Sequence, residues 1–232
     1  MKLSKILLLF LLIININAES VNSGHAEISL IKFKQSELTN NKNLIGIKMD
    51  MQKNWHTYWK NPGDSGGPIK VIWKTTENIS IGDIKWPTPQ LIPYEPLMTY
   101  GYKDFVIFPF EYNKNSDKNS NIELNIDFLI CDDVCIPEKA KIQTTLNEIQ
   151  EDPNLVEWNN KVPSIELPVL SKVKKGFLEL RFSFNNPIES AIFFIENKDT
   201  VDHPAEQILI KEENNWLLKI PLLKNTSPIE TF

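Results

Sequence analysis

Short runs of β-branched and aromatic residues, separated by turn-forming residues, recur along most of the chain, and this pattern constrains the fold most strongly. Apolar residues alternate or cluster over a few positions and rarely recur at the spacing of a helix. Runs of this kind, bounded by Gly, Pro, Asn and Asp, are typical of the strands of a β-sandwich. We therefore predict an all-β protein.

The expected strands form two groups along the chain. The first group comprises residues 26–33, 43–51, 55–60, 69–74, 105–112, 122–130 and 139–146. The second group comprises residues 177–184, 191–195, 207–211 and 216–221. The polar run NKNSDKNSN at 113–121 is expected to be an exposed hairpin loop.

The pattern changes at residues 151–163, where we place a linker between two domains. The run EDPNLVEWNN is expected to form one or two helical turns, because Asp152-Pro153 places an N-cap before a first-turn proline. The first domain then spans 19–150, and the second, smaller β-domain spans 164–232. The sequence ends without an obvious closing strand, so a truncated chain and an incomplete last domain both stay open.

The first residues have the features of a secretory signal peptide. Lys2 and Lys5 precede an apolar run at 6–14, and Ala18 offers a small residue for cleavage. The run is about half of the roughly 20 residues that a membrane-spanning helix needs. Residues 1–18 are therefore expected to be removed on export to the periplasm, which leaves a mature chain that does not span the membrane.

The mature chain is acidic. Loss of Lys2 and Lys5 changes the formal charge from −5 to −7 (−5 − 2). Such a surface is a poor partner for nucleic acid or for anionic membranes.

Residues 63–68 read GDSGGP, the run that surrounds the nucleophilic serine of trypsin-like proteases. Ser65 lies too near the N-terminus, and His25 and His56 lie too close to it in sequence for the two-barrel fold of those enzymes. We interpret the run as a tight turn rich in Gly and Pro between two strands. A serine protease remains a weak rival.

The two cysteines of the chain, Cys131 and Cys135, are the strongest candidates for chemistry. In a continuous strand they would lie roughly 13 Å apart, beyond the roughly 7 Å limit for bonded Cα atoms. A disulfide therefore requires a turn at 132–134, and the strand-like flanks would place the cysteines face to face at the mouth of a hairpin. Asp132 and Asp133 are expected to raise the pKa of a neighbouring thiol.

Spacing alone leaves a structural and a redox role open. Closing so short a loop stabilises the fold by only about 2 kcal/mol, which is little for a structural disulfide. A short loop disulfide is also of the kind that a partner thiol can reduce. A metal site is a distant third, because two sulfurs without a nearby histidine fill half a tetrahedral site.

Several motifs in order resemble one known family. They are WHTYWKNPGDSGGP (55–68), VIWK (71–74), IKWPTPQ (84–90), YGYKD (100–104) and ICDDVCIPE (130–138). Together they resemble the N-terminal periplasmic domain of DsbD-type and ScsB-type thiol-disulfide interchange proteins over about residues 25–146. Residues 191–207 are more weakly similar to the second β-domain of the ScsB-type branch.

The resemblance implies an immunoglobulin-like sandwich followed by a second, smaller β-sandwich-like domain. It implies that Cys131 and Cys135 take electrons from a membrane-embedded thiol reductase and pass them to periplasmic thioredoxin-like proteins, without a cofactor. The membrane and thioredoxin-like domains of the family are missing, so the chain would be a relay. A role in copper tolerance or cytochrome c biogenesis is a further association, although only the two sulfurs suit copper.

Aromatic residues are the candidates for capping the disulfide or contacting a partner. His56 and Tyr58 point to one side of their expected strand and Trp55 and Trp59 to the other, where core packing is expected. His56 has two interpretations, proton transfer near the disulfide and a local hydrogen bond.

Tyr100 and Tyr102 are the other candidates, because related domains shield the disulfide with an aromatic loop. The glycine between them would give such a cap freedom to move. An ordinary turn with one buried ring is the alternative.

The main rival to a redox relay is a non-enzymatic exported binding module. In that interpretation the Cys131–Cys135 disulfide is static, and the aromatic surface recognises a protein partner.

Overall fold

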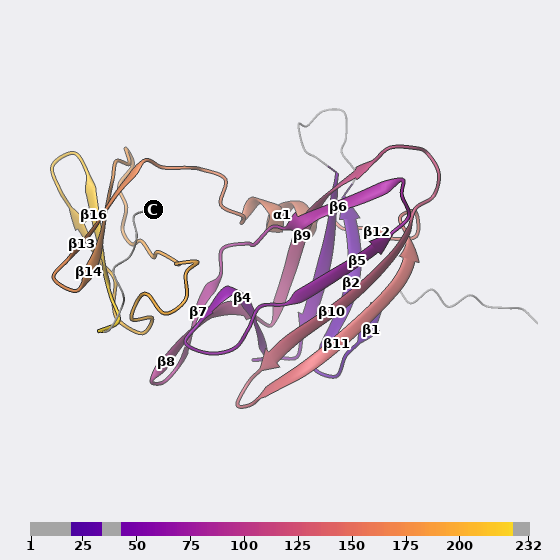
Figure 1. Cartoon of the computed structure of the whole chain (residues 1–232), viewed down its shortest axis with the longest axis horizontal. Helices are drawn as coiled ribbons and strands as arrows, with labels where there is room; N and C mark the ends of the chain where they lie inside the picture. The colour runs from indigo at the N-terminus through magenta and orange to yellow at the C-terminus, as the bar shows by residue number, and fades with distance from the viewer. Residues whose placement is uncertain (1–19, 34–42, 225–232) are drawn as a thin grey trace, which may run out of the picture.

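The computed structural model describes residues 20–33 and 43–224. The predicted signal peptide and the end of the chain lie outside these residues. The described part contains two six-stranded sheets that face each other and a separate four-stranded sheet (Figure 1). The predicted all-β class is confirmed.

The first sheet has the strand order β1-β2-β3-β9-β6, with β12 paired to β2. Its strands are β1 (Ser20–Asn22), β2 (Ala26–Phe33), β3 (Leu44–Met51), β6 (Ile79–Ile84), β9 (Phe105–Lys114) and β12 (Gln150–Glu151). The second sheet has the order β11-β10-β4-β8-β7, with β5 paired to β10. Its strands are β4 (His56–Gly63), β5 (Lys70–Thr75), β7 (Gln90–Tyr94), β8 (Leu97–Lys103), β10 (Asn121–Cys131) and β11 (Cys135–Thr145).

Alternation of apolar and polar residues explains how the two sheets form a sandwich. Along β10 the residues Ile122, Leu124, Ile126, Phe128 and Ile130 are buried, while the positions between them are half-buried or exposed. Each such side chain contributes about 1.5–3 kcal/mol when fully buried. The inner faces of the two sheets thus enclose one apolar core, and the resulting sandwich is immunoglobulin-like.

The expected strands of this sandwich agree with the observed ones to within a few residues, except that β11 begins earlier, at Cys135. The loop expected at 113–121 lies between β9 and β10. Strands β6, β7 and β8 were not predicted, and neither were the short strands β1 and β12. The explanation for β6, β7 and β8 lies in their sequences. Gly82, Pro93 and Gly101 interrupt these runs, and such residues weaken the sequence signal of a strand.

The predicted helical turns form α1 (Asn154–Asn160). The Asp152 carboxylate accepts a hydrogen bond from the Asn154 N–H at 2.9 Å. Leu155 is fully buried, and the Trp158 ring contacts the rings of Tyr102 and Phe105. The helix therefore packs on the sandwich, and the division of the chain into two domains at 151–163 stays a prediction.

The small sheet has the order β13-β14-β16-β15. Its strands are β13 (Val169–Lys174), β14 (Phe177–Phe182), β15 (Ile208–Lys211) and β16 (Trp216–Pro221). Strand β13 was not predicted, and the strand predicted at 191–195 is wrong. These residues form a loop whose Ala191, Phe193 and Ile195 cover one face of the small sheet in place of a second sheet.

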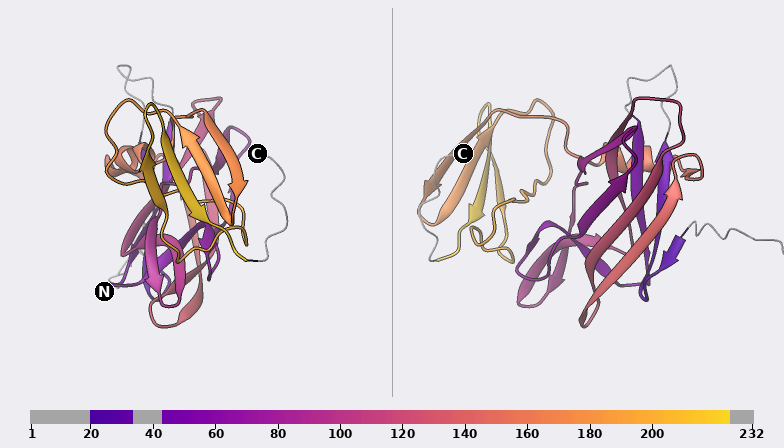
Figure 2. Two further views of the ribbon diagram at one scale, coloured as in Figure 1. Left: turned by 90° about the vertical axis from the view of Figure 1, so that its left-hand side faces the viewer. Right: turned by 45° about the vertical axis from the view of Figure 1, so that its right-hand side comes forward.

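The loop that covers the small sheet also contacts the sandwich (Figure 2). The Asn61 side-chain amide donates hydrogen bonds to the backbone oxygens of Ile195 and Asn197, at 2.7 and 3.2 Å. Tyr100 Oη lies 2.9 Å from His203 Nδ1. Because Asn61 lies on β4 and Tyr100 on β8, the small sheet is attached to the strands that also support the cysteine pair.

Candidate functional site

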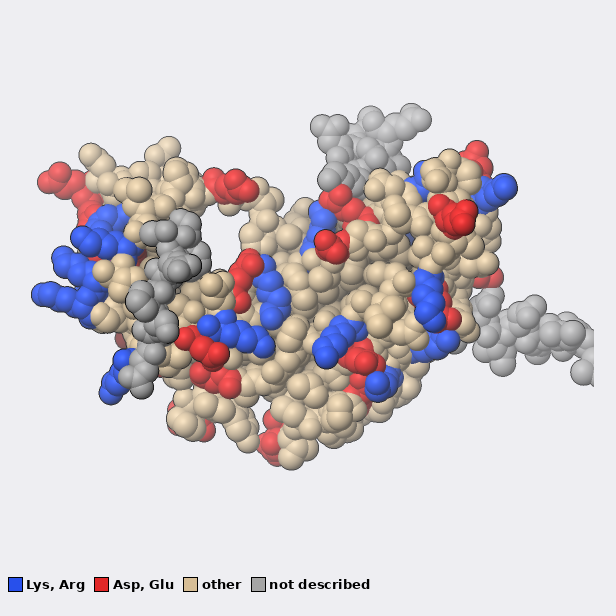
Figure 3. Space-filling view, viewed as in Figure 1, with Lys and Arg blue, Asp and Glu red and all other residues tan. Residues whose placement is uncertain are grey.

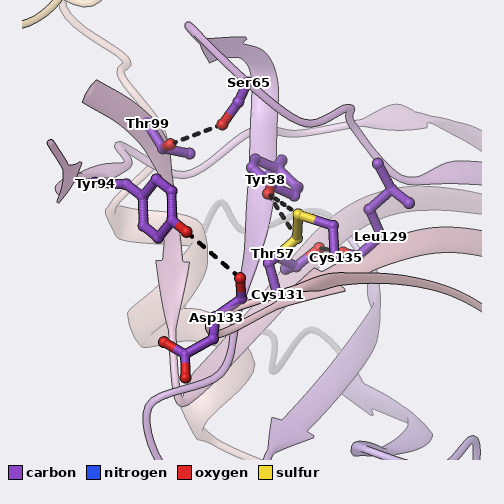
Figure 4. Close-up of a disulfide and its surroundings, with 9 residues drawn as sticks. All are labelled: Thr57, Tyr58, Ser65, Tyr94, Thr99, Leu129, Cys131, Asp133 and Cys135. Atoms are coloured by element: carbon purple, nitrogen blue, oxygen red, sulfur yellow. Dashed lines mark hydrogen bonds between the residues drawn. A yellow bond between two sulfur atoms is a disulfide. The ribbon is translucent and has the colours of Figure 1, made fainter. Parts of the chain in front are cut away.

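The two cysteines close the β10–β11 hairpin. The register of these antiparallel strands ends with Cys131 opposite Cys135, and the two residues form a disulfide with their Cα atoms 4.2 Å apart (Figure 4). The turn lies at Asp132, Asp133 and Val134. The sequence prediction that the cysteines face each other at the mouth of a hairpin is confirmed.

The two cysteine residues differ in exposure. Cys131 is only 2% exposed, whereas Cys135 is exposed, and the neighbouring Val134 is 63% exposed at the tip of the hairpin. Because a thiolate must approach the sulfur that it attacks, an incoming thiol reaches Cys135 more readily than Cys131.

Tyr58 places a hydroxyl group against the disulfide from β4. Its oxygen lies 2.7 Å from Cys131 Sγ and 3.2 Å from Cys135 Sγ (Figure 4). The bonded sulfurs carry no proton, so the tyrosine O–H is the donor in this contact. Burial raises the pKa of Tyr58 to about 12, so this hydroxyl keeps its proton near neutral pH.

The GDSGGP run supports Tyr58. Gly66 has a φ of +93°, and a Cβ atom at this position would lie 2.1 Å from the Tyr58 ring. A residue with a side chain therefore cannot occupy position 66 unless the ring moves. Ser65 Oγ lies 3.4 Å from Thr99 Oγ1 (Figure 4), so its hydrogen-bond partner is a threonine. These contacts give the run a structural role beside the disulfide.

His56 is buried on the same strand as Tyr58. Its ring lies edge-on to the Tyr58 ring, with centroids 5.3 Å apart, and its backbone is in register with Cys131. Burial lowers the pKa of His56, and Asp132 opposes this shift. Next to it, Thr57 Oγ1 donates a hydrogen bond to Leu129 O at 3.0 Å, which ties β4 to β10. The proton-transfer role of His56 stays a prediction.

Tyr100 and Tyr102 do not lie on a loop. Both are buried in β8, whose neighbours on its two sides are β4 and β7. The Tyr102 hydroxyl donates to Pro87 O at 2.7 Å, and the Tyr100 hydroxyl contacts His203. A freely moving cap formed by these two residues is therefore a wrong prediction, because a strand paired on both edges cannot open like a loop.

Tyr94 is a further aromatic residue beside the cysteine hairpin. It ends β7, is 53% exposed, and its hydroxyl lies 3.5 Å from Asp133 O (Figure 4). The sequence analysis did not select it. The tip of a hairpin containing Pro93 and Pro96 was the available signal, because exposed hairpin tips often carry functional side chains.

Glu138 anchors the strand that carries Cys135. It is buried, and its carboxylate accepts hydrogen bonds from the Ser23 hydroxyl at 2.6 Å and from the His25 backbone N–H at 3.1 Å. It also lies 2.6 Å from His25 Nδ1, and the His25 ring stacks on Trp55. A charged residue at an inward-facing strand position was the sequence signal for this cluster, which the sequence analysis missed.

No group of three or more His, Cys, Asp or Glu side chains within residues 20–33 and 43–224 is placed to hold a metal ion. Over the same residues, no helix has the length and apolar character required to cross a membrane.

Comparison with known proteins agrees with this geometry. Residues 29–147 match the family of N-terminal domains of the thiol:disulfide interchange protein DsbD. The chain belongs to this family. The matched region of this DsbD-type N-terminal domain includes Tyr58 and both cysteines. No curated protein matches the chain.

A solved structure with the same fold extends the comparison beyond the family match. It is the N-terminal periplasmic domain of ScsB from Proteus mirabilis, with a TM-score of 0.58 and 19% sequence identity. The likeness covers 88% of this chain and 83% of that chain. The shared fold therefore extends beyond the DsbD-type sandwich into the small sheet.

Proposed function

We propose that the Cys131–Cys135 disulfide is reversible and relays electrons from a membrane-embedded thiol reductase to periplasmic thioredoxin-like proteins. The observation that carries this proposal is the asymmetry of the pair, in which an exposed cysteine is bonded to a buried cysteine whose sulfur faces a hydroxyl donor. Membership of a thiol:disulfide interchange family supports it.

The reduction step follows from this asymmetry. A partner thiolate attacks Cys135 Sγ and forms a mixed disulfide, the Cys131–Cys135 bond breaks, and Cys131 leaves as a thiolate. The Tyr58 hydroxyl donates a hydrogen bond to that thiolate and so stabilises the leaving group. A second thiolate of the partner then attacks the partner sulfur that is bonded to Cys135. This step forms a disulfide within the partner and releases Cys135 as a thiolate. The two electrons of the partner dithiol thus pass to this chain.

A periplasmic location is part of the same proposal. The predicted signal peptide at 1–18 supports it, as does the fold shared with a domain that is periplasmic in Proteus mirabilis. An oxidising compartment also suits a protein whose two cysteines are joined.

The equilibrium redox potential of the pair tests the proposal. Thiol trapping of the mature protein across a graded series of dithiol buffers should give a potential above about −300 mV. Structural disulfides in secreted proteins typically have potentials below this value. Cys131→Ala should then trap mixed disulfides through Cys135.

A disulfide that resists reduction until the protein unfolds would reject the relay. It would favour a binding module with a static disulfide. Labelling of Ser65 by a serine-directed covalent probe would favour a protease, and we expect no labelling.

A further inference from the structure

Strand β13 is an open edge of the small sheet. It pairs with β14 along one side, and all six of its residues are exposed. No other described strand pairs with its second side, so the backbone groups on that side have no strand partner within the described residues. An open edge of this kind can accept a further strand from another chain.

An apolar cavity of about 600 Å³ opens beside this edge. It is lined by Val169 and Ser171 of β13, by Leu180 and Phe182 of β14, and by Ala191 and Phe193 of the covering loop. The loop therefore leaves part of the inner face of the small sheet uncovered next to the open edge. A strand added to β13 would place every second side chain on the side of this cavity.

The opposite side of β13 is basic. Register places Val169, Ser171 and Val173 on the inner face with Leu178, Leu180 and Phe182. The outer face therefore carries Lys172 and Lys174 together with the exposed Leu170, and Lys172 lies opposite Glu179 of β14. Basic side chains gather over the part of the molecule that contains the small sheet, at the left of Figure 3. The edge thus combines an apolar inner side with a positively charged outer side.

We propose that β13 binds an extended segment of a partner protein in which apolar residues alternate with acidic residues. The backbone of this segment pairs with the open edge, its apolar side chains enter the cavity, and its carboxylates face Lys172 and Lys174. The site lies outside the cysteine pair, so the proposal does not rest on the proposed redox function.

The lysines also decide against a second copy of this chain as the occupant. In the antiparallel register centred on Lys172, two β13 strands that keep their inner faces on the same side would set Lys172 of one copy opposite Lys172 of the other. Like charges in directly opposed strand positions are destabilising. An acidic strand would instead set its carboxylates opposite Lys172 and Lys174, and opposite charges at facing strand positions are stabilising.

Binding of a synthetic peptide to the full chain tests the proposal. The probe is a fluorescently labelled peptide of six residues, the length of β13, in which valine and glutamate alternate. Fluorescence anisotropy should show saturable binding that is the same with the disulfide oxidised or reduced. The double substitution Lys172→Glu and Lys174→Glu should weaken binding roughly tenfold, whereas Lys118→Glu in the loop before β10 should leave it unchanged.

The same peptide with alternate backbone amides N-methylated tests strand pairing on the unchanged chain, so the result does not depend on how a variant folds. It should not bind, because it cannot form the backbone hydrogen bonds of an edge pair. The proposal is overturned if the unmodified peptide does not bind saturably, or if charge reversal and N-methylation leave binding intact. Concentration-dependent dimerisation of the full chain that the unmodified peptide suppresses would also overturn it, in favour of a second copy.

Discussion

The hydroxyl group of Tyr58 is positioned to donate a hydrogen bond to the sulfur of the buried Cys131. The Tyr58 O–H contacts Cys131 at 2.7 Å, and a hydrogen bond to a charged acceptor is worth about 1.5–3 kcal/mol. Tyr58→Phe should therefore raise the thiol pKa of Cys131 by about one unit and slow reduction by a partner thiol roughly tenfold. Thiol alkylation and exchange rates measured against pH would check both effects.

Tyr102→Phe is the matched control for this change. It removes a buried tyrosine hydroxyl whose partner is Pro87 O. Equal effects of the two substitutions on the thiol pKa would contradict a specific role of Tyr58.

The two aspartates of the hairpin turn should act in the opposite direction. A negative charge beside a sulfur disfavours its thiolate form, so Asp132→Asn combined with Asp133→Asn should lower the thiol pKa of the reduced protein and speed its alkylation near pH 7. Asp117→Asn, which removes one carboxylate in the loop between β9 and β10, should have no effect. Unchanged alkylation rates in the hairpin variant would show that solvent screens both carboxylates.

Individual residues show how far the sequence predicts this site. The facing of Cys131 and Cys135 was predictable, because a turn between two alternating strands fixes their register. Contact of Tyr58 with both sulfurs was not, because the pattern of one strand gives the side on which a residue lies but not its partner across the sheet. The mobile cap expected from Tyr100 and Tyr102 failed for a different reason, because Gly101 between them suggested a loop and both residues lie in β8.

At the scale of an element, the GDSGGP run at 63–68, which ends β4 and leads toward β5, makes room for the Tyr58 ring. Gly66 must stay without a side chain because the Tyr58 ring occupies the space of its Cβ. Gly66→Ala should destabilise the protein by about 2–4 kcal/mol, through the positive φ and through displacement of the ring. Denaturant unfolding would measure the loss, and thiol alkylation would show whether the hydroxyl has moved from the sulfurs.

Gly67→Ala is the control, because a Cβ there meets nothing closer than Leu129 Cδ1 at 3.8 Å. A loss of stability in this variant as large as that in Gly66→Ala would contradict the assigned role of the turn.

Elements were predictable where alternation is regular and not where turn residues interrupt it. β10 shows regular alternation, and its prediction agreed closely with the structure. β8 contains Gly101, and a Cβ atom at this position would lie 2.2 Å from the Thr57 backbone oxygen. There is therefore no room for a side chain at position 101. A glycine of this kind resembles a turn in the sequence, although it marks a close approach of two strands.

At the scale of the whole molecule, the contact between the sandwich and the covering loop of the small sheet contains a buried histidine. His203 Nδ1 lies 2.9 Å from the Tyr100 hydroxyl, and Asp64, Asp199 and Asp202 are the charged groups that act on it. Burial lowers the pKa of His203 below its ordinary value of 6.5, against the pull of the three carboxylates. His56 is shifted in the same direction. Both histidines are therefore expected to be neutral at pH 7.

This shift makes the stability of the folded chain depend on pH. Below pH 6.5 the unfolded chain binds a proton at His203 more readily than the folded chain does, so the contribution of this residue is present above 6.5 and is lost as the pH falls. His203→Asn, which keeps a polar partner for Tyr100 but cannot gain a charge, should flatten the decline in the unfolding midpoint between about pH 7 and pH 5. Denaturant unfolding at a series of pH values measures the slope.

His25→Asn, at a histidine outside this contact, shows whether any histidine substitution gives the same result. An unchanged slope in His203→Asn would mean that the contact between the sandwich and the covering loop does not respond to acid. A flattened slope would show that the contact between His203 of the covering loop and Tyr100 of β8 is sensitive to acid. Because β8 pairs with β4, which carries Tyr58, the attachment of the small sheet and the surroundings of the disulfide would then depend on the same pair of strands.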